Sequence, residues 1–248
     1  MQGLVDLHHH LIWDMDDGAQ SFDESVQMLH RAVQQGVYCV AATCHVDSGY
    51  HAFDLQTYHH RLNELRSYAA ARQLPVQIVS AAEVFYSSVM PRLLQQGAVL
   101  PLGDSWHVLV EFSPHVAYET LCRAAVHIAN AGYTMVLAHA ERYRCLYWGQ
   151  RLGRLREEYH VCIQINSHTM MDAGKGLRAR WIRKIMQEGW VDIVASDAHN
   201  LEQRACNLGE CADWLAAQWG VETARKLLID HPTAILMEKR NLHQRKNA

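Results

Sequence analysis

Long apolar runs are absent from this sequence of 248 residues, and none approaches the roughly 20 residues that a helix needs to cross a bilayer. The N-terminal segment lacks a basic stretch followed by an apolar one, so we expect no secretory signal and a cytoplasmic location. A formal net charge of −3 argues against nucleic acid or an anionic membrane as a partner. The composition, 49% hydrophobic and 20% charged, predicts a globular protein, with a single domain over residues 1–248.

Paired cysteines are also missing, because the seven cysteines are odd in number and form no C-x-x-C pair. We expect reduced thiols that pack as small hydrophobic side chains, without a disulfide framework. The sequence has no recognisable nucleophile loop of a cysteine-dependent phosphatase or protease. Cys44 precedes His45 and is an alternative metal ligand, although a structural role for its thiol is favoured.

Strand-like apolar runs alternate with helix-like segments along the whole chain, which predicts βα units and a parallel sheet. Because these strands and helices account for nearly the whole chain, we expect a distorted TIM-like (β/α)7 barrel, one strand short of the usual eight. The expected strands are residues 4–12, 38–44, 76–84, 106–112, 134–139, 161–166 and 191–196. The expected helices are residues 21–36, 55–72, 118–131, 149–159, 177–188, 201–219 and 221–229.

Histidines and acids recur at the ends of the apolar runs, where a barrel of this kind builds its active site. His8 and His10 are alternate residues of one strand, so their imidazoles share a face and His9 points away. A surface histidine run or a tag remnant is the alternative interpretation. Asp197-x-His199 repeats this geometry on the last strand, which barrel closure places beside the first. Further candidates end other runs: His45, Glu83, Glu111 and His139.

The carboxylates in this set make a metal site the favoured interpretation. Glu83 and Glu111 each end an apolar stretch, and a buried carboxylate without a cation costs several kcal/mol. Either an arginine or a metal ion could supply the charge, and the many histidines favour metal. A bridging carboxylate can hold two cations a few ångströms apart. Asp16 and Asp17 with His45 could complete a further site.

Two arginines follow the candidate ligands closely, Arg142 after His139 and Arg204 after His199. A guanidinium group can bind phosphate oxygens through paired hydrogen bonds, so both residues are predicted to contact a phosphoryl group. A surface position or a structural ion pair is the alternative for either arginine alone. Metal ligands and phosphate-binding arginines together predict a metal-dependent phosphoester hydrolase.

The sequence resembles the PHP-superfamily protein-tyrosine phosphatases of bacterial capsule and exopolysaccharide loci, the CpsB/CapC-like group, over essentially its whole length. The resemblance rests on these stretches: Val5-Asp-Leu-His-His-His10 with Asp16-Asp-Gly18, Ala42-Thr-Cys-His45, Leu109-Val-Glu-Phe112, Ala138-His-Ala-Glu-Arg-Tyr143, Gln164-Ile-Asn-Ser167 and Val194-Ala-Ser-Asp-Ala-His-Asn-Leu201. It implies a distorted seven-stranded barrel with three divalent metal ions at the C-terminal rim of the strands, manganese first and iron, cobalt or zinc as alternatives.

The resemblance also implies a role for each candidate residue. His8, His10, Glu83 and Asp197 would hold one metal, Glu83, Glu111 and His139 a second, and Asp17, His45 and His199 a third. Arg142 and Arg204 would bind phosphate, and Asp17 is counted with them among the catalytic residues. A hydroxide shared between metals would be the nucleophile.

The substrate implied by the resemblance is phosphotyrosine on the tail of a tyrosine autokinase that controls polysaccharide synthesis. The loop Val46-Asp-Ser-Gly-Tyr-His51 departs from relatives that carry basic residues there, which weakens the expectation of peptide recognition. A phosphatase of a small phosphomonoester such as histidinol phosphate is one alternative. A metal-binding regulator without catalysis is another, although no ligand of the set is missing.

Overall fold

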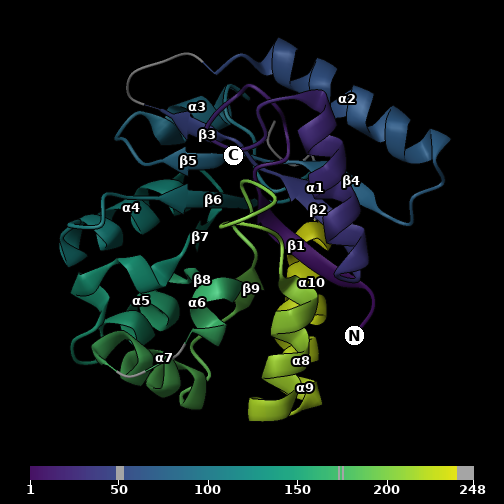
Figure 1. Ribbon diagram of the computed structural model, residues 1–248. Coiled ribbons are helices and arrows are strands. Elements are labelled where there is room, and N and C mark those ends of the chain that lie inside the picture. Colours follow the sequence, from purple (N-terminus) through teal and green to yellow (C-terminus); the bar gives the residue numbers. More distant parts are fainter. Residues whose placement is uncertain (49–52, 173, 175, 239–248) are drawn as a thin grey trace.

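The computed structural model describes residues 1–48, 53–172, 174 and 176–238 of the chain (Figure 1). The strands are β1 Leu4–His9, β2 Val37–Ala42, β3 His45–Asp47, β4 Gln77–Ser80, β5 Glu83–Phe85, β6 His107–Glu111, β7 Thr134–Leu137, β8 Cys162–Asn166 and β9 Ile193–Ala195. The α-helices are α1 Phe22–Gln34, α2 Leu55–Ala71, α3 Met90–Gln95, α4 Tyr118–Asn130, α5 Arg151–Tyr159, α6 Ser167–Met171, α7 Leu177–Gln187, α8 Leu208–Trp219, α9 Val221–Arg225 and α10 His231–Met237. The 3₁₀ helices are η1 Ala140–Arg142 and η2 Arg144–Leu146, and η3 Lys226–Asp230 is a π-helix. None of the helices described is long and apolar enough to cross a membrane.

All of the strand pairs are parallel, and they form two sheets with the orders β1-β2-β4 and β3-β5-β6-β7-β8-β9. The first and last strands approach each other at their C-terminal ends. There the His10 amide donates to the Ala198 carbonyl at 2.8 Å, and the Asp197 amide donates to the His8 carbonyl at 2.8 Å. The helices lie around the outside of the strands (Figure 1). The predicted distorted α/β barrel with parallel strands is confirmed.

One of the predicted strands divides into a pair, which distorts the barrel: residues 76–84 give β4 and the start of β5. The strand predicted for residues 38–44 is β2, and β3 follows it as a separate strand that begins at His45. Tyr58 of α2 is fully buried at this step: its hydroxyl donates to the Ala42 carbonyl at 2.7 Å and accepts from the Ala81 amide at 2.9 Å. One side chain thus satisfies backbone groups that would otherwise be unpaired between the two sheets. A continuous strand over residues 76–84 was therefore wrong, and Val46 and Asp47, which the sequence analysis placed in a loop, belong to β3.

The strands are packed on both faces, because alternate side chains enter two separate apolar clusters. Ala41 and Leu109 belong to an inner cluster, whereas their neighbours Val40, Val108 and Val110 belong to the larger cluster beneath the helices. This alternation is typical of a barrel whose interior is filled by side chains. The inner cluster leaves the C-terminal ends of the strands to polar residues.

The helix predicted for residues 201–219 begins later, at Leu208. The preceding residues form a turn in which the Asn200 side chain accepts from the backbone amides of Glu202 and Arg204, both at 3.0 Å. Asparagine side chains compete with helical hydrogen bonds in this way. The consequence is functional, since this turn positions Arg204 near the strand ends.

Candidate metal centre

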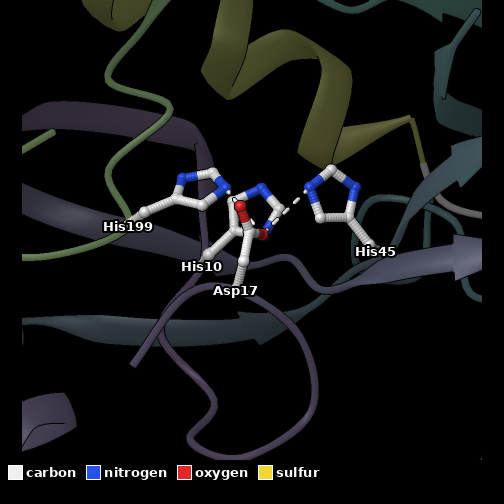
Figure 2. Close-up of side chains that lie close together, drawn as sticks. All are labelled: His10, Asp17, His45 and His199. Atoms are coloured by element: carbon white, nitrogen blue, oxygen red, sulfur yellow. Dashed lines mark ion pairs between the residues drawn. The ribbon is translucent and has the colours of Figure 1, made fainter. Parts of the chain in front are cut away.

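All of the predicted ligands meet at the C-terminal ends of the strands. Three groups of ligand atoms, each within 4.8 Å of one another, overlap there. Figure 2 shows the one that involves the loop after β1, made of His10, Asp17, His45 and His199. The others are His8, His10, Glu83 and Asp197, and His45, Glu83 and Glu111. His139 joins through Glu83 and Glu111, with its Nε2 2.7 Å and 3.3 Å from their carboxylate oxygens.

Glu83 is the centre of this arrangement. Its side chain is fully buried, and its Oε2 lies 3.0 Å from His8 Nε2, 3.2 Å from His10 Nε2 and 3.3 Å from His45 Nδ1. Burial alone would raise the pKa of this carboxyl, but the histidines around it outweigh burial and hold the pKa well below its usual range. Glu83 is therefore an anion that several groups share, which is the role expected of a bridging carboxylate.

Asp16 orients His10, a role that the sequence analysis did not separate from metal ligation. His10 Nδ1 donates to Asp16 Oδ2 at 2.7 Å, and the His45 amide donates to the same oxygen at 2.8 Å. Burial opposes ionisation, yet the contact with His10 lowers the pKa of Asp16 to about 2. Holding Nδ1 in this way directs Nε2 of His10 into the cluster, as carboxylates commonly do for metal-binding histidines.

Gln164 also supports the candidate ligands. The sequence analysis named it only within the stretch Gln164-Ile-Asn-Ser167 and assigned it no role. Its Oε1 accepts from the His139 amide at 2.7 Å and lies 3.3 Å from His8 Nδ1. The Tyr143 hydroxyl lies 3.4 Å from His139 Nδ1. These contacts fix imidazole rings whose other nitrogens face the carboxylates.

The backbone is strained at two of the ligands. His139 and Asp197 have φ values of +32° and +54°, in the left-handed region that residues with a side chain seldom adopt. Each such residue costs on the order of 1–3 kcal/mol and persists only where the surroundings enforce it. Each lies two residues beyond the end of its strand, β7 or β9, where this backbone turns its side chain into the cluster.

The arrangement of the donor atoms suits coordination of divalent cations better than hydrogen bonding between the side chains themselves. Glu83 Oε2 and His199 Nε2 are buried, and none of their close contacts with described residues has the geometry of a hydrogen bond. His8 Nε2 lies 3.1 Å from His10 Nε2. At this distance at least one of the two nitrogens must carry no proton, or both must bind the same cation. Imidazole and carboxylate donors together suit Mn, Fe, Co or Zn. We conclude that the residues present fit divalent metal.

Both predicted phosphate-binding arginines lie at this cluster. Arg142 Nη2 donates to Asp197 Oδ2 at 2.6 Å, and Arg204 Nη2 donates to Asp197 Oδ1 at 3.0 Å. Arg204 Nη1 also lies 3.5 Å from Asp17 Oδ2. The two guanidinium groups line one hollow of about 240 Å³ with Asp197 and Asn166. They flank the same carboxylate while remaining partly exposed, so an anion can reach both.

Cys44 lies outside these ligand groups. Its thiol is packed in the apolar core, and burial raises its pKa well above the usual range. A protonated thiol is a poor ligand and a poor nucleophile. His9 points away from the cluster and contacts Asp6 instead, at 3.1 Å.

The site thus defines the class of protein: an α/β barrel with a histidine and carboxylate metal centre at the C-terminal ends of its strands. A family profile described as capsular polysaccharide synthesis, CpsB/CapC, matches residues 4–237. The chain belongs to the CpsB/CapC family.

Individual relatives agree with this assignment. Tyrosine-protein phosphatase CpsB of Streptococcus pneumoniae is 29% identical over 241 residues, which cover 95% of this chain and 99% of that protein. A solved structure from a study of the metal-dependent tyrosine phosphatases YwqE from Bacillus subtilis and CpsB from Streptococcus pneumoniae superposes with a TM-score of 0.85 and 25% identity, over 96% of each chain. An amidohydrolase from Mycoplasma synoviae shares the fold alone, with a TM-score of 0.59 and 12% identity over 96% of this chain and 89% of that one.

Proposed function

We propose that this chain is a metal-dependent protein-tyrosine phosphatase. The observation that carries the proposal is the meeting of the complete predicted ligand set with two arginines at one rim, in a chain of the CpsB/CapC family. Its relatives are named tyrosine-protein phosphatases, and a structure with 25% identity is described as a metal-dependent one. The proposal extends to one domain over residues 1–248 and to a cytoplasmic location.

We propose three divalent metal ions, with manganese as the first candidate. His8, His10, Glu83 and Asp197 would hold the first, and His10 would also face the third. Glu83, Glu111 and His139 would hold the second, an assignment supported by the short contacts of His139 with both carboxylates. Asp17, His45 and His199 would hold the third.

Bound divalent cations would act as Lewis acids and bring the pKa of a water molecule near neutrality. The residues of the chain would position the phosphoryl group for attack. Arg142 and Arg204, which approach Asp197 from two sides, would turn their remaining donors to the phosphoryl oxygens and neutralise charge that develops there. Phenolate, with a parent pKa of about 10, needs little help to leave.

The exposure of the third group indicates where substrate enters. The side chains of Asp17 and His45 are 63% and 35% exposed, whereas those of His8, His10 and Glu83 are fully buried. Hollows of about 780 Å³ and 770 Å³ adjoin the site at Arg142 and at Asp17, respectively. This open rim suits a phosphotyrosyl side chain on a peptide better than a small alcohol phosphate that needs enclosure. We propose the tail of a tyrosine autokinase as the physiological substrate.

The proposed function is tested with a panel of substrates for the purified, metal-loaded protein. We expect hydrolysis of a phosphotyrosyl peptide to exceed that of a matched phosphoseryl peptide and of histidinol phosphate in kcat/KM. The physical reason is that phenolate is a better leaving group than the alkoxide of serine or histidinol, and that the open rim can accommodate a peptide. Preferential hydrolysis of histidinol phosphate would establish the small-molecule alternative, and no hydrolysis of any substrate would support a regulatory role.

Replacing Arg142 or Arg204 by alanine is expected to lower turnover while the metal ions stay bound. A guanidinium group has no lone pair to offer a metal, so each arginine acts on the anion. Charged hydrogen bonds contribute on the order of 1.5–3 kcal/mol, so kcat/KM should fall by roughly tenfold to a hundredfold. Steady-state kinetics on the phosphotyrosyl peptide and metal analysis are the measurements.

Lysine at either position should restore activity only in part, because a point charge cannot form the paired hydrogen bonds. Arg154→Ala serves as the control, since Arg154 is exposed on α5 and pairs with Glu158 at 3.7 Å. Metal content that falls in parallel with turnover would show that the arginines act on Asp197 rather than on substrate.

A further inference from the structure

A hollow of about 780 Å³ adjoins the metal centre and shares Arg142 with it. We call it the basic groove, and it is lined in part by His115, Arg142, Arg144, Tyr147, Trp148 and Arg178. The mechanism above uses only Arg142 of these residues. The others therefore need a separate explanation.

The basic groove is continuous with the site along a single chain segment. The segment that follows β7 supplies the ligand His139, then the phosphate-binding Arg142 in η1, then Arg144 in η2 and Trp148 beyond it. When Arg142 binds the phosphoryl group, the peptide residues next to the phosphotyrosine would therefore lie within a few residues' length of the basic groove.

The wall of the basic groove is fixed in place. The Tyr147 ring stacks on Trp181 with centroids 4.6 Å apart, and its hydroxyl donates to the Glu141 carbonyl at 2.5 Å. The Trp181 indole donates to the Leu146 carbonyl at 3.1 Å. Trp148 next to this wall is 61% exposed, an unusually large apolar surface for a side chain to leave in water. A preformed wall lowers the entropic cost of binding an extended peptide.

The charge of the basic groove is positive. Arg144 and Arg178 are exposed, and Arg178 has a long ion pair of 3.6 Å with the exposed Asp172, which is worth little. Among the described residues that line the groove, only Glu141 carries a carboxyl group, and its side chain is buried. An acidic peptide that extends from Arg142 along the groove would therefore meet the guanidinium groups of Arg142, Arg144 and Arg178.

The hollow on the other side of the metal centre has the opposite character. Its lining includes Asp14, Asp17, Asp47 and Asp54, with Arg61 as its arginine. An acidic peptide would be repelled by this hollow and attracted to the basic groove. The opposite charges would therefore orient the bound peptide toward the basic groove. Val46 and Asp47 line this acidic hollow, and they begin the loop whose lack of basic residues weakened the expectation of peptide recognition. Residues 49–51 of that loop lie outside the described part of the chain.

We propose that the basic groove binds acidic residues that flank the phosphotyrosine in the same peptide, with an apolar side chain of that peptide against Trp148. Arg144 and Arg178 pair with the carboxylates, and the aromatic wall supplies apolar contact. This inference rests on the proposed phosphatase function and names the sequence context that the site selects.

The test compares the double variant Arg144→Gln/Arg178→Gln with the parent, both metal-loaded, on three substrates. These are a phosphotyrosyl peptide flanked by aspartate and glutamate, the same peptide with serine at those positions, and para-nitrophenyl phosphate. Exposed charge pairs contribute up to about 1 kcal/mol, so we expect KM for the acidic peptide to rise about tenfold in the double variant, with kcat unchanged. The other two substrates should be unaffected, and high salt should remove the preference of the parent for the acidic peptide.

The control is Arg154→Gln, which removes an exposed arginine of α5 that is not part of the basic groove. An equal rise in KM for both peptides, or a rise in the control as large as in the double variant, would overturn the role of the basic groove while leaving the phosphatase function intact. Failure of the parent to hydrolyse any of the three substrates would overturn the proposed function, and this inference with it.

Discussion

Removing metal from the purified protein with a strong chelator is expected to abolish phosphatase activity, and added Mn²⁺ is expected to restore it. Among the described residues, no cysteine belongs to the ligand groups around Glu83, and the Cys44 thiol is buried with a pKa well above its usual range. Without cations the cluster has carboxylates and imidazoles in contact with one another and nothing to activate water. Activity on a phosphotyrosyl peptide before and after chelation, with metal analysis of each sample, is the measurement.

Thiol alkylation is the matched control for this experiment. Cys39, Cys44, Cys206 and Cys211 are buried, and the partly buried Cys122, Cys145 and Cys162 belong to none of the ligand groups. An alkylating reagent applied to the folded protein should therefore leave turnover unchanged. Inactivation by alkylation combined with resistance to chelation would contradict the metal mechanism.

Replacing Glu83 by alanine is expected to lower both metal content and activity more than any other single substitution at the site. One fully buried carboxylate lies within 3.3 Å of nitrogens of His8, His10, His45 and His139. Its loss leaves these ligands without the anion that they share and leaves neighbouring cations to repel each other. Substitution of residues that merely support ligands costs about 10–100-fold, so kcat/KM should fall by more than roughly a hundredfold.

Metal stoichiometry by mass spectrometry and kinetics on the same samples measure this effect. Glu83→Gln preserves the size of the side chain and removes only its charge, so it separates loss of a ligand from loss of packing. Glu119→Ala, at an exposed position of α4, is the control for a carboxylate that belongs to none of the ligand groups. Unchanged metal content in both Glu83 variants would exclude Glu83 as a ligand.

The barrel class could be predicted because it depends on a local pattern. Parallel strands buried on both faces appear as short apolar runs, and the helices between them have recognisable starts, such as Ser21, whose side chain accepts from the Glu24 amide at 3.2 Å. The division of the strand over residues 76–84 could not be predicted, because Ala81 and Ala82 at the break are as apolar as Ile78 and Val79 before it. The break depends on Tyr58, which reaches Ala42 and Ala81 from a distant helix.

By itself the sequence determined which residue types stand at the strand ends, and hence the candidate ligands His8, His10, Asp17, His45, Glu83, Glu111, His139, Asp197 and His199. Only the tertiary structure decided that Glu83 is their centre, that Asp16 orients His10, and that Arg142 and Arg204 converge on Asp197. It also decided the left-handed backbone at His139 and Asp197, and it assembled a basic groove from segments around residues 115, 142–148 and 178. The physical reason is that residue type and periodicity are local properties of a chain, whereas distances between side chains far apart in sequence arise only when the strands pack side by side.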